Sequence, residues 1–176
     1  MSQTHVNFKL VDSGLQISEY DDFLAASPDN LRQSKCCGKA VVEYKCPYTN
    51  KHLHPREAFL DKSVGGEQNS DGTYSLNPKH KYYFQIQGAM ASVQYDLCDF
   101  VIYTQNASNN YDGSIFVVQV PFSINFWNDV RTVRQFYLTW MLPIILDEVS
   151  DKVEGSNKEK SVSGKWVQWY HCITKM

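Results

Sequence analysis

The chain has 176 residues, of which 43% are hydrophobic and 20% are charged, and its formal net charge is −2. This composition is typical of a globular protein, and the length predicts one domain with a core of its own. The charge excludes a global basic field for nucleic acid, so contacts with nucleic acid would have to be local. No stretch reaches the roughly eighteen apolar residues of a membrane span, and no signal peptide is expected, so we predict no membrane partner.

The five cysteines are odd in number and do not suggest a disulfide framework. Cys46 and Cys98 lie in apolar segments and are predicted to be buried as small hydrophobic residues. Cys36 and Cys37 are too close in sequence to supply two ligands to one ordinary zinc site. This usage fits a reducing, intracellular compartment, and the choice between nucleus and cytoplasm stays open.

The first part of the chain predicts a sheet. Residues 6–18 alternate loosely and indicate short strands, and residues 21–27 form a short apolar segment. A hairpin is expected to begin at 29–32, to turn through 33–39 and to return as a valine-rich strand at 40–46.

Helices and further strands follow. Residues 55–62 predict a short helix with a proline in its first turn, and residues 63–78, rich in Gly, Ser, Asn and Asp, predict a loop. Residues 79–95 show helical periodicity, and apolar strands are expected at 98–104 and 114–120. A turn within the polar residues that connect these two strands would make them a hairpin.

The longest predicted helix covers residues 124–149, and Pro143 is expected to kink it near its end. Its apolar residues follow helical spacing and are predicted to be core; among them are Phe126, Met141 and Ile144. Residues 149–164 are charged and serine-rich and predict disorder.

The strand at 40–46 carries the chemistry that stands out. Side chains alternate along a strand, so Glu43 and Lys45 share one face while Tyr44 points to the other. Hydrolysis of a phosphodiester places negative charge on oxygen, and a hard cation such as Mg²⁺ takes carboxylate and carbonyl oxygens plus waters. Asp29 and Glu43 could supply carboxylates, the Tyr44 carbonyl a further ligand, and Lys45 could orient or deprotonate the attacking water.

The spacing alone does not establish such a site. A Glu-any-Lys triplet on a strand is more often a solvated face with a surface ion pair. In the same way Gln85 and Gln87, on the helix predicted at 79–95, are ordinary surface glutamines unless a wider pattern assigns them a role.

Blocks of the sequence, in the right order, resemble the YqaJ-type viral recombinase family, which is related to phage lambda exonuclease and to alkaline exonucleases. The resemblance spans about residues 12–148. The blocks are residues 14–15, 23–31, 42–48, 82–90, 98–104, 136–137 and 142–143.

The resemblance implies a member of the PD-(D/E)XK nuclease superfamily. The implied fold is α/β and restriction-endonuclease-like, with a central mixed β-sheet flanked by helices. The resemblance matches Asp29 and Glu43 to the metal-binding acids and Lys45 to the catalytic lysine, with Mg²⁺ or Mn²⁺ as the cofactor.

Further site residues are implied in the same way. Gln85 matches the helix glutamine beside the catalytic site, and Tyr82 lies one turn before it as a candidate substrate contact. Ser27 matches a position that can contact a substrate phosphate. Family members usually carry a longer N-terminal region with a further acid near the metals, and Asp12 is the nearby candidate here.

The activity implied is a Mg²⁺-dependent deoxyribonuclease, an exonuclease that resects linear duplex DNA from a free end in recombination or repair. A local basic groove, drawn from residues such as Arg32, Lys45 and Lys81, could hold the DNA. One alternative is a catalytically weakened DNA-binding or interaction domain of the same fold, and another is a structure-specific endonuclease. Homo-oligomerisation is left open.

The resemblance places a nuclease domain, short at its N-terminus, at residues 1–148. Residues 149–176 are then a polar linker and a Trp-rich tail whose segments resemble pieces of a PHD-type zinc finger. The zinc-ligand cysteines between those segments are absent, so we predict no structural zinc there.

Overall fold

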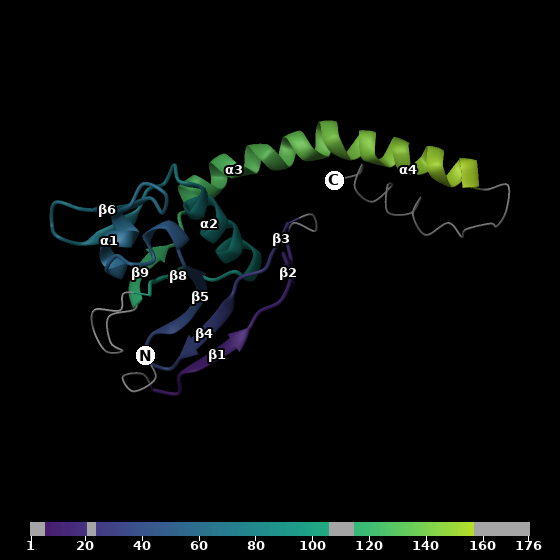
Figure 1. Ribbon diagram of the computed structural model, residues 1–176. Coiled ribbons are helices and arrows are strands. Elements are labelled where there is room, and N and C mark those ends of the chain that lie inside the picture. Colours follow the sequence, from purple (N-terminus) through teal and green to yellow (C-terminus); the bar gives the residue numbers. More distant parts are fainter. Residues whose placement is uncertain (1–5, 21–23, 106–114, 157–176) are drawn as a thin grey trace. The chain divides into compact units, whose positions relative to one another are not determined.

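A computed structural model describes residues 6–20, 24–105 and 115–156. The chain divides into two units, residues 1–127 and 128–176, and each is described by itself. The first unit is built on a five-stranded sheet with the strand order β1-β4-β5-β8-β9 (Figure 1). Its strands are β1 (Lys9–Asp12), β4 (Asn30–Ser34), β5 (Gly38–Lys45), β8 (Leu97–Tyr103) and β9 (Ile115–Pro121).

The sheet is mixed, as the resemblance implied. Strands β5 and β8 run parallel, while β1–β4, β4–β5 and β8–β9 are antiparallel pairs. The predicted hairpin is present: Ser34 pairs with Gly38, and Gly38 has a φ of 69°, a left-handed value that glycine adopts without a steric penalty. The antiparallel pairing of β8 with β9 is also confirmed, and the turn expected between them lies outside the described residues.

One face of this sheet carries the core. Residues Val41, Phe100 and Ile102 are fully buried there, because α1 (Pro55–Leu60) and α2 (Lys81–Val93) pack on strands β5, β8 and β9. The fully buried ring of Phe59, from α1, lies edge to face with Phe100, their centroids 6.5 Å apart. The helix predicted at 79–95 is thereby fixed across the parallel pair.

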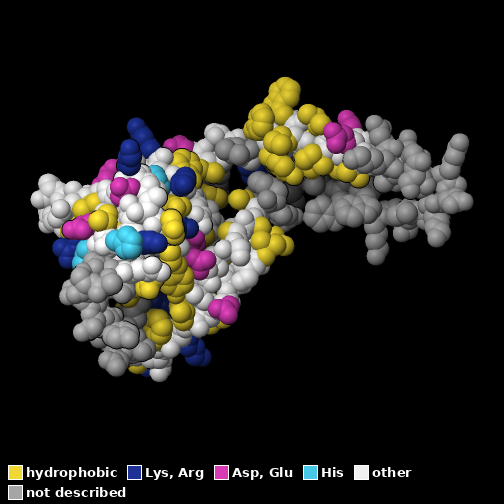
Figure 2. Space-filling view, in the orientation of Figure 1, with side chains coloured by type: hydrophobic (Ala, Val, Ile, Leu, Met, Phe, Trp, Pro, Cys, Tyr) yellow, Lys and Arg dark blue, Asp and Glu magenta, His cyan; other side chains and the backbone are white. Residues whose placement is uncertain are grey.

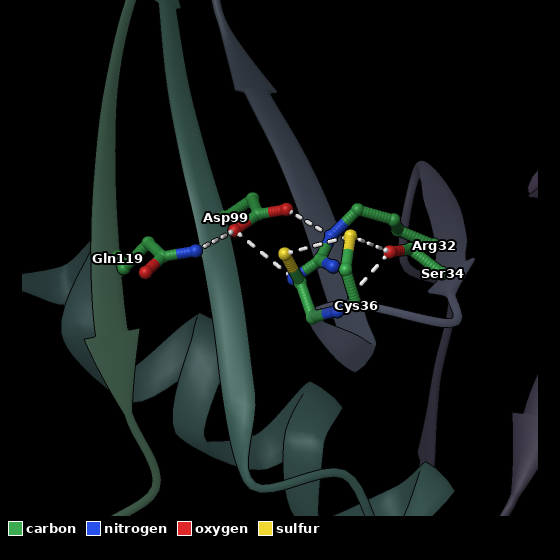
Figure 3. A network of polar contacts seen from close by, with 6 residues as sticks. Arg32, Ser34, Cys36, Asp99 and Gln119 are labelled. Carbon is green, nitrogen blue, oxygen red and sulfur yellow. Dashed lines mark hydrogen bonds and ion pairs between the residues drawn. The ribbon is translucent and has the colours of Figure 1, made fainter. Parts of the chain in front are cut away.

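The opposite face of the sheet buries a charge pair. Arg32 on β4 is 3% exposed, and its guanidinium contacts the carboxylate of Asp99 on β8 (Figure 3). Gln119 on β9 also donates a hydrogen bond to Asp99, at 3.1 Å. The small side chains of Ala40 and Val42, on the strand between, leave room for the long arginine.

The segment predicted as a loop at 63–78 contains a small hairpin, in which β6 (Gly66–Gln68) pairs with β7 (Tyr74–Leu76). Its polar composition suggested a loop, but Leu76 is buried in the core. A second two-stranded element pairs β2 (Gln16–Ile17) with β3 (Ala25–Ala26). A 3₁₀ turn, Tyr48–Asn50, follows β5.

The segment predicted as the longest helix is helical over α3 (Ile124–Phe136), a π-helical turn (Tyr137–Met141) and α4 (Leu142–Ser156). Pro143 lies in the first turn of α4, directly after the π turn, because proline has no N–H to continue the regular hydrogen-bond ladder. The disorder predicted from residue 149 is wrong as far as Ser156, where α4 ends.

The predicted core stripe of this helix is wrong beyond its first turns. Phe126 packs edge to face on Phe84, but Trp140, Met141 and Ile144 are exposed. Figure 2 shows hydrophobic side chains gathered on the surface of the α3–α4 segment. Within residues 128–156 the described chain is helical throughout, so no second layer among the described residues of this unit covers those side chains.

The two cysteines predicted to be buried differ. Cys98 is fully buried on the core face of β8, whereas Cys46 follows the end of β5 and is exposed, which corrects the prediction. Residues 157–176, with the Trp-rich segment, lie outside the described residues. In the part of the chain that the structure describes, no helix has the length and apolar character needed to span a bilayer.

Candidate active site

Glu43 and Lys45 lie on the core face of β5, at the end of the strand that the hairpin does not close. The Lys45 Nζ atom is 2.5 Å from the Glu43 Oε1 atom, and Glu43 is 3% exposed. The strand period brings the two side chains to one face, and the packing of α2 on that face removes both from bulk water. The pair is therefore largely buried, unlike the solvated surface pair that the triplet alone favoured.

Gln85 joins this pair from α2. Its Nε2 atom donates a hydrogen bond to the same Glu43 oxygen that contacts Lys45. The two residues are 42 positions apart in sequence, and the packing of α2 on β5 brings them together. One carboxylate oxygen thus receives two donors, which orients the side chain.

Burial dominates the electrostatics of Glu43. It raises the pKa of the Glu43 carboxyl above its ordinary value, although the hydrogen bond and the charge of Lys45 act in the opposite direction. The negative charge of Asp29 raises the pKa further, while the Gln85 hydrogen bond lowers it. A carboxylate in this position would gain from a positive charge brought close to it.

Asp29 supplies the second acid. The buried Pro28 holds the chain just before β4, and the Asp29 Oδ2 atom accepts a hydrogen bond of 2.7 Å from the Tyr44 backbone N–H. The Asp29 carboxylate is therefore anchored at the peptide that links Glu43 to Tyr44. The Tyr44 side chain points to the opposite face, as predicted from the alternation.

The donor set suits a hard divalent cation. Asp29 and Glu43 offer carboxylate oxygens, and the Tyr44 carbonyl lies on the same short stretch of β5. Among the described residues no group of three or more His, Cys, Asp or Glu side chains gathers to hold a metal. Mg²⁺ is usually bound by only a few protein oxygen atoms and keeps several water ligands. These residues therefore fit Mg²⁺ better than zinc.

Tyr82 lies against the lysine. The Lys45 Nζ atom is 4.6 Å from the centroid of the Tyr82 ring, within the range of a cation–π interaction. The ring is held between His80, with centroids 5.0 Å apart, and Phe100, at 6.0 Å. The structure thus gives Tyr82 a contact with Lys45 that the resemblance did not indicate.

A pocket of about 290 Å³ opens beside these groups and brings Ser27 together with Glu43 and Gln85. Its other walls have no charged or polar side chain. They are Leu24, Ala25, Ala26, Phe84, Gly88 and Ala89. Sequence reasoning missed Phe84 and Gly88; their spacing of four residues on one helix was the signal, since such residues share a face.

Two residues predicted near the site are elsewhere. Asp12 pairs with Asn30 on the face opposite Glu43, where the Asn30 side chain donates to it at 2.9 Å. Arg32 is buried in its pair with Asp99 on that same opposite face, so it cannot contribute to a basic groove. The strand register explains this, because the side chains of Asp12 and Arg32 point to the same face of the sheet as Val42, which is opposite to the face of Glu43.

A family profile described as the YqaJ-like viral recombinase domain matches residues 3–96. No curated protein is similar enough to count as a match.

Two solved structures are similar in fold. The alkaline exonuclease LHK-Exo from Laribacter hongkongensis has 21% sequence identity and a TM-score of 0.59. LHK-Exo in complex with dAMP has 21% identity and a TM-score of 0.58. Each comparison covers 88% of this chain and 66% of that chain, so this chain spans just under two thirds of their length. The predicted α/β, restriction-endonuclease-like fold is confirmed.

Proposed function

The chain belongs to the YqaJ-like viral recombinase domain family, and from this we propose that it is a deoxyribonuclease that depends on a divalent cation. The observation that carries the proposal is the joining of Glu43, Lys45 and Gln85 in one hydrogen-bonded group, with Asp29 anchored beside it. An acid pair, a lysine and a pocket in one place are what phosphodiester hydrolysis requires.

The proposed metal site uses the Asp29 and Glu43 carboxylates and the Tyr44 carbonyl. A bound Mg²⁺ or Mn²⁺ would offset the negative charge that develops on the phosphate oxygens. The raised pKa of Glu43 supports this role, because desolvation makes the carboxylate gain more from a nearby cation than it would in water.

Lys45 is the proposed catalytic lysine. In the described arrangement its ammonium is held by Glu43, 2.5 Å away, and by the Tyr82 ring. From there it could orient the attacking water or offset charge on the phosphate. Gln85 keeps Glu43 in place, and Ser27, which lines the same pocket, is the proposed contact for a substrate phosphate.

The substrate we propose is linear duplex DNA with a free end, processed as an exonuclease in recombination or repair. Two features are compatible with it: the open pocket beside Glu43, and the lysines Lys45 and Lys81, which both lie close to the Tyr82 ring. With a net charge of −2, attraction to DNA would be concentrated at such local groups.

The test is digestion of a linear, 5′-phosphorylated duplex with Mg²⁺ or Mn²⁺, beside the same DNA as a closed circle. Wild type should remove one strand of the linear substrate only, and a chelator should stop it. Lys45→Ala should lower the rate by roughly 10²–10⁴-fold. Lys39→Ala is the matched control, since Lys39 lies on the same strand and the same face.

The alternatives have separate outcomes. Cleavage of the closed circle would favour the structure-specific endonuclease. Absence of cleavage by a folded protein that still binds DNA would favour the binding domain. Equal rates for wild type and Lys45→Ala would remove the assigned role of the lysine.

A further inference from the structure

Cys36 and Cys37 bring their thiols together in the turn between β4 and β5. Their Sγ atoms are 3.3 Å apart, and both residues are exposed. In an extended strand neighbouring side chains point to opposite faces, so two adjacent cysteines would not meet. The turn reverses the chain between Ser34 and Gly38 and allows both sulfur atoms to lie on one side.

The turn holds this arrangement through Ser34. The Ser34 Oγ atom lies 3.0 Å from the Cys36 Sγ atom and also accepts the Cys37 backbone N–H at 3.2 Å (Figure 3). The Lys35 N–H donates to the Val6 carbonyl at 2.9 Å, which ties the turn to the segment before β1. The two thiols are therefore preorganised by bonds outside the pair.

A disulfide does not suit this geometry. Adjacent Cα atoms are about 3.8 Å apart across a trans peptide, which is less than the roughly 4.4 Å at the short end of the disulfide range. Contact with the Cys36 thiol raises the pKa of the Cys37 thiol, and the charge of Arg32 opposes this only in part. The raised pKa lowers the fraction of thiolate, which disfavours a reagent that must react with one thiolate alone. A reagent that binds both sulfur atoms at once needs no rearrangement of the turn.

An ordinary zinc site is also unsuitable. Zinc in structural sites takes four ligands, and the described residues contain no group of three or more side chains able to hold a metal. Soft metal ions and metalloids that take few ligands can be bound by thiolates alone.

We propose that Cys36 and Cys37 form a two-thiolate site for a soft, thiophilic ion or metalloid, separate from the candidate active site. The site lies at the opposite end of β5 from Glu43 and Lys45. With a trivalent arsenical oxide, both S–H bonds break and two As–S bonds form. The two protons and the oxide oxygen leave as one water, with no change in oxidation state.

The test uses phenylarsine oxide on the whole chain, with excess 2-mercaptoethanol present and intact-mass measurement. Wild type should retain one arsenical per chain, and a dithiol such as dithiothreitol should remove it. Cys36→Ser and Cys37→Ser should each lose the adduct. Cys46→Ser is the control and should keep it, because Cys46 is exposed but outside the pair.

A second measurement does not depend on the variants folding. Trypsin cleaves after Lys35 and Lys39, so the wild-type adduct should map to the peptide of residues 36–39, which contains both sulfurs. No adduct on wild type under excess monothiol, an adduct mapped to another peptide, or retention in a folded Cys36→Ser or Cys37→Ser variant would each overturn the proposal.

Discussion

The ammonium of Lys45 lies between two partners, the Glu43 carboxylate at 2.5 Å and the face of the Tyr82 ring at 4.6 Å. One partner comes from the same strand and the other from α2. The lysine is therefore positioned before any substrate arrives, and its position depends on a helix that is distant in sequence.

This relationship separates two roles for Tyr82. If the ring positions Lys45, Tyr82→Phe should keep most of the cleavage rate, while Tyr82→Leu should lose the equivalent of about 0.5–2 kcal/mol in transition-state stabilisation. The measurement is kcat and KM on linear duplex DNA. A Phe variant as slow as the Leu variant would instead assign the role to the hydroxyl, as a substrate contact.

Gln85 should act through the acid it contacts. Its hydrogen bond lowers the pKa of the Glu43 carboxyl, so Gln85→Ala should raise that pKa. The acidic limb of the pH–rate profile should then move to higher pH, with a loss of roughly 1 kcal/mol in folding stability. Lys39→Ala serves as the control, and an unshifted acidic limb in Gln85→Ala would contradict this link.

The ionised form of Glu43 should lower the stability of the folded protein. Because its folded-state pKa is raised, the shift favours folding below the unfolded pKa, and this contribution is lost as pH rises through the folded pKa. Glu43→Gln, which carries no charge, should therefore gain stability relative to wild type as pH rises above roughly 4. Thermal unfolding across pH, without divalent cations, measures this.

The opposite result is informative. If Glu43→Gln is less stable than wild type at neutral pH, the ion pair with Lys45 outweighs the desolvation of the carboxylate.

Metal binding can be measured without catalysis. Binding to the folded state alone stabilises it by about 2.7 kcal/mol at 100 times the dissociation constant, so Mg²⁺ should raise the unfolding temperature of wild type. Asp29→Asn should remove this increase. Asp12→Asn is the matched control, because Asp12 lies on the other face of the sheet. An equal response in both variants would exclude Asp29 as a ligand.

The buried pair of Arg32 and Asp99 should matter for folding rather than for DNA. Asp99→Ala leaves the guanidinium buried without its carboxylate, which should cost roughly 3–5 kcal/mol in the free energy of unfolding. Replacing both residues, as Arg32→Met with Asp99→Leu, should cost much less. Chemical denaturation of the single and double variants tests this, and equal losses would contradict it.

The sequence resemblance was sufficient for the fold class, since its order of blocks implied the mixed α/β sheet that the structure has. Predictions from hydrophobic pattern failed where burial depends on a partner layer. Met141 and Ile144 have core-like spacing, but no other described segment of their own unit covers them, and Cys46 lies one residue past a buried strand. Arg32 was read as a DNA contact because its ion-pair partner is 67 positions away.

By itself, the sequence determined that Glu43 and Lys45 share a face, because side chains alternate with a period of two along any strand. It also determined that Tyr44 points away from them. Only the tertiary structure decided that this face is buried, that Gln85 and Tyr82 meet the pair, and that Asp29 is anchored at the Tyr44 amide. Those contacts join the strand to α2 and to the segment before β4, and such positions are set by the packing of the whole sheet rather than by local sequence.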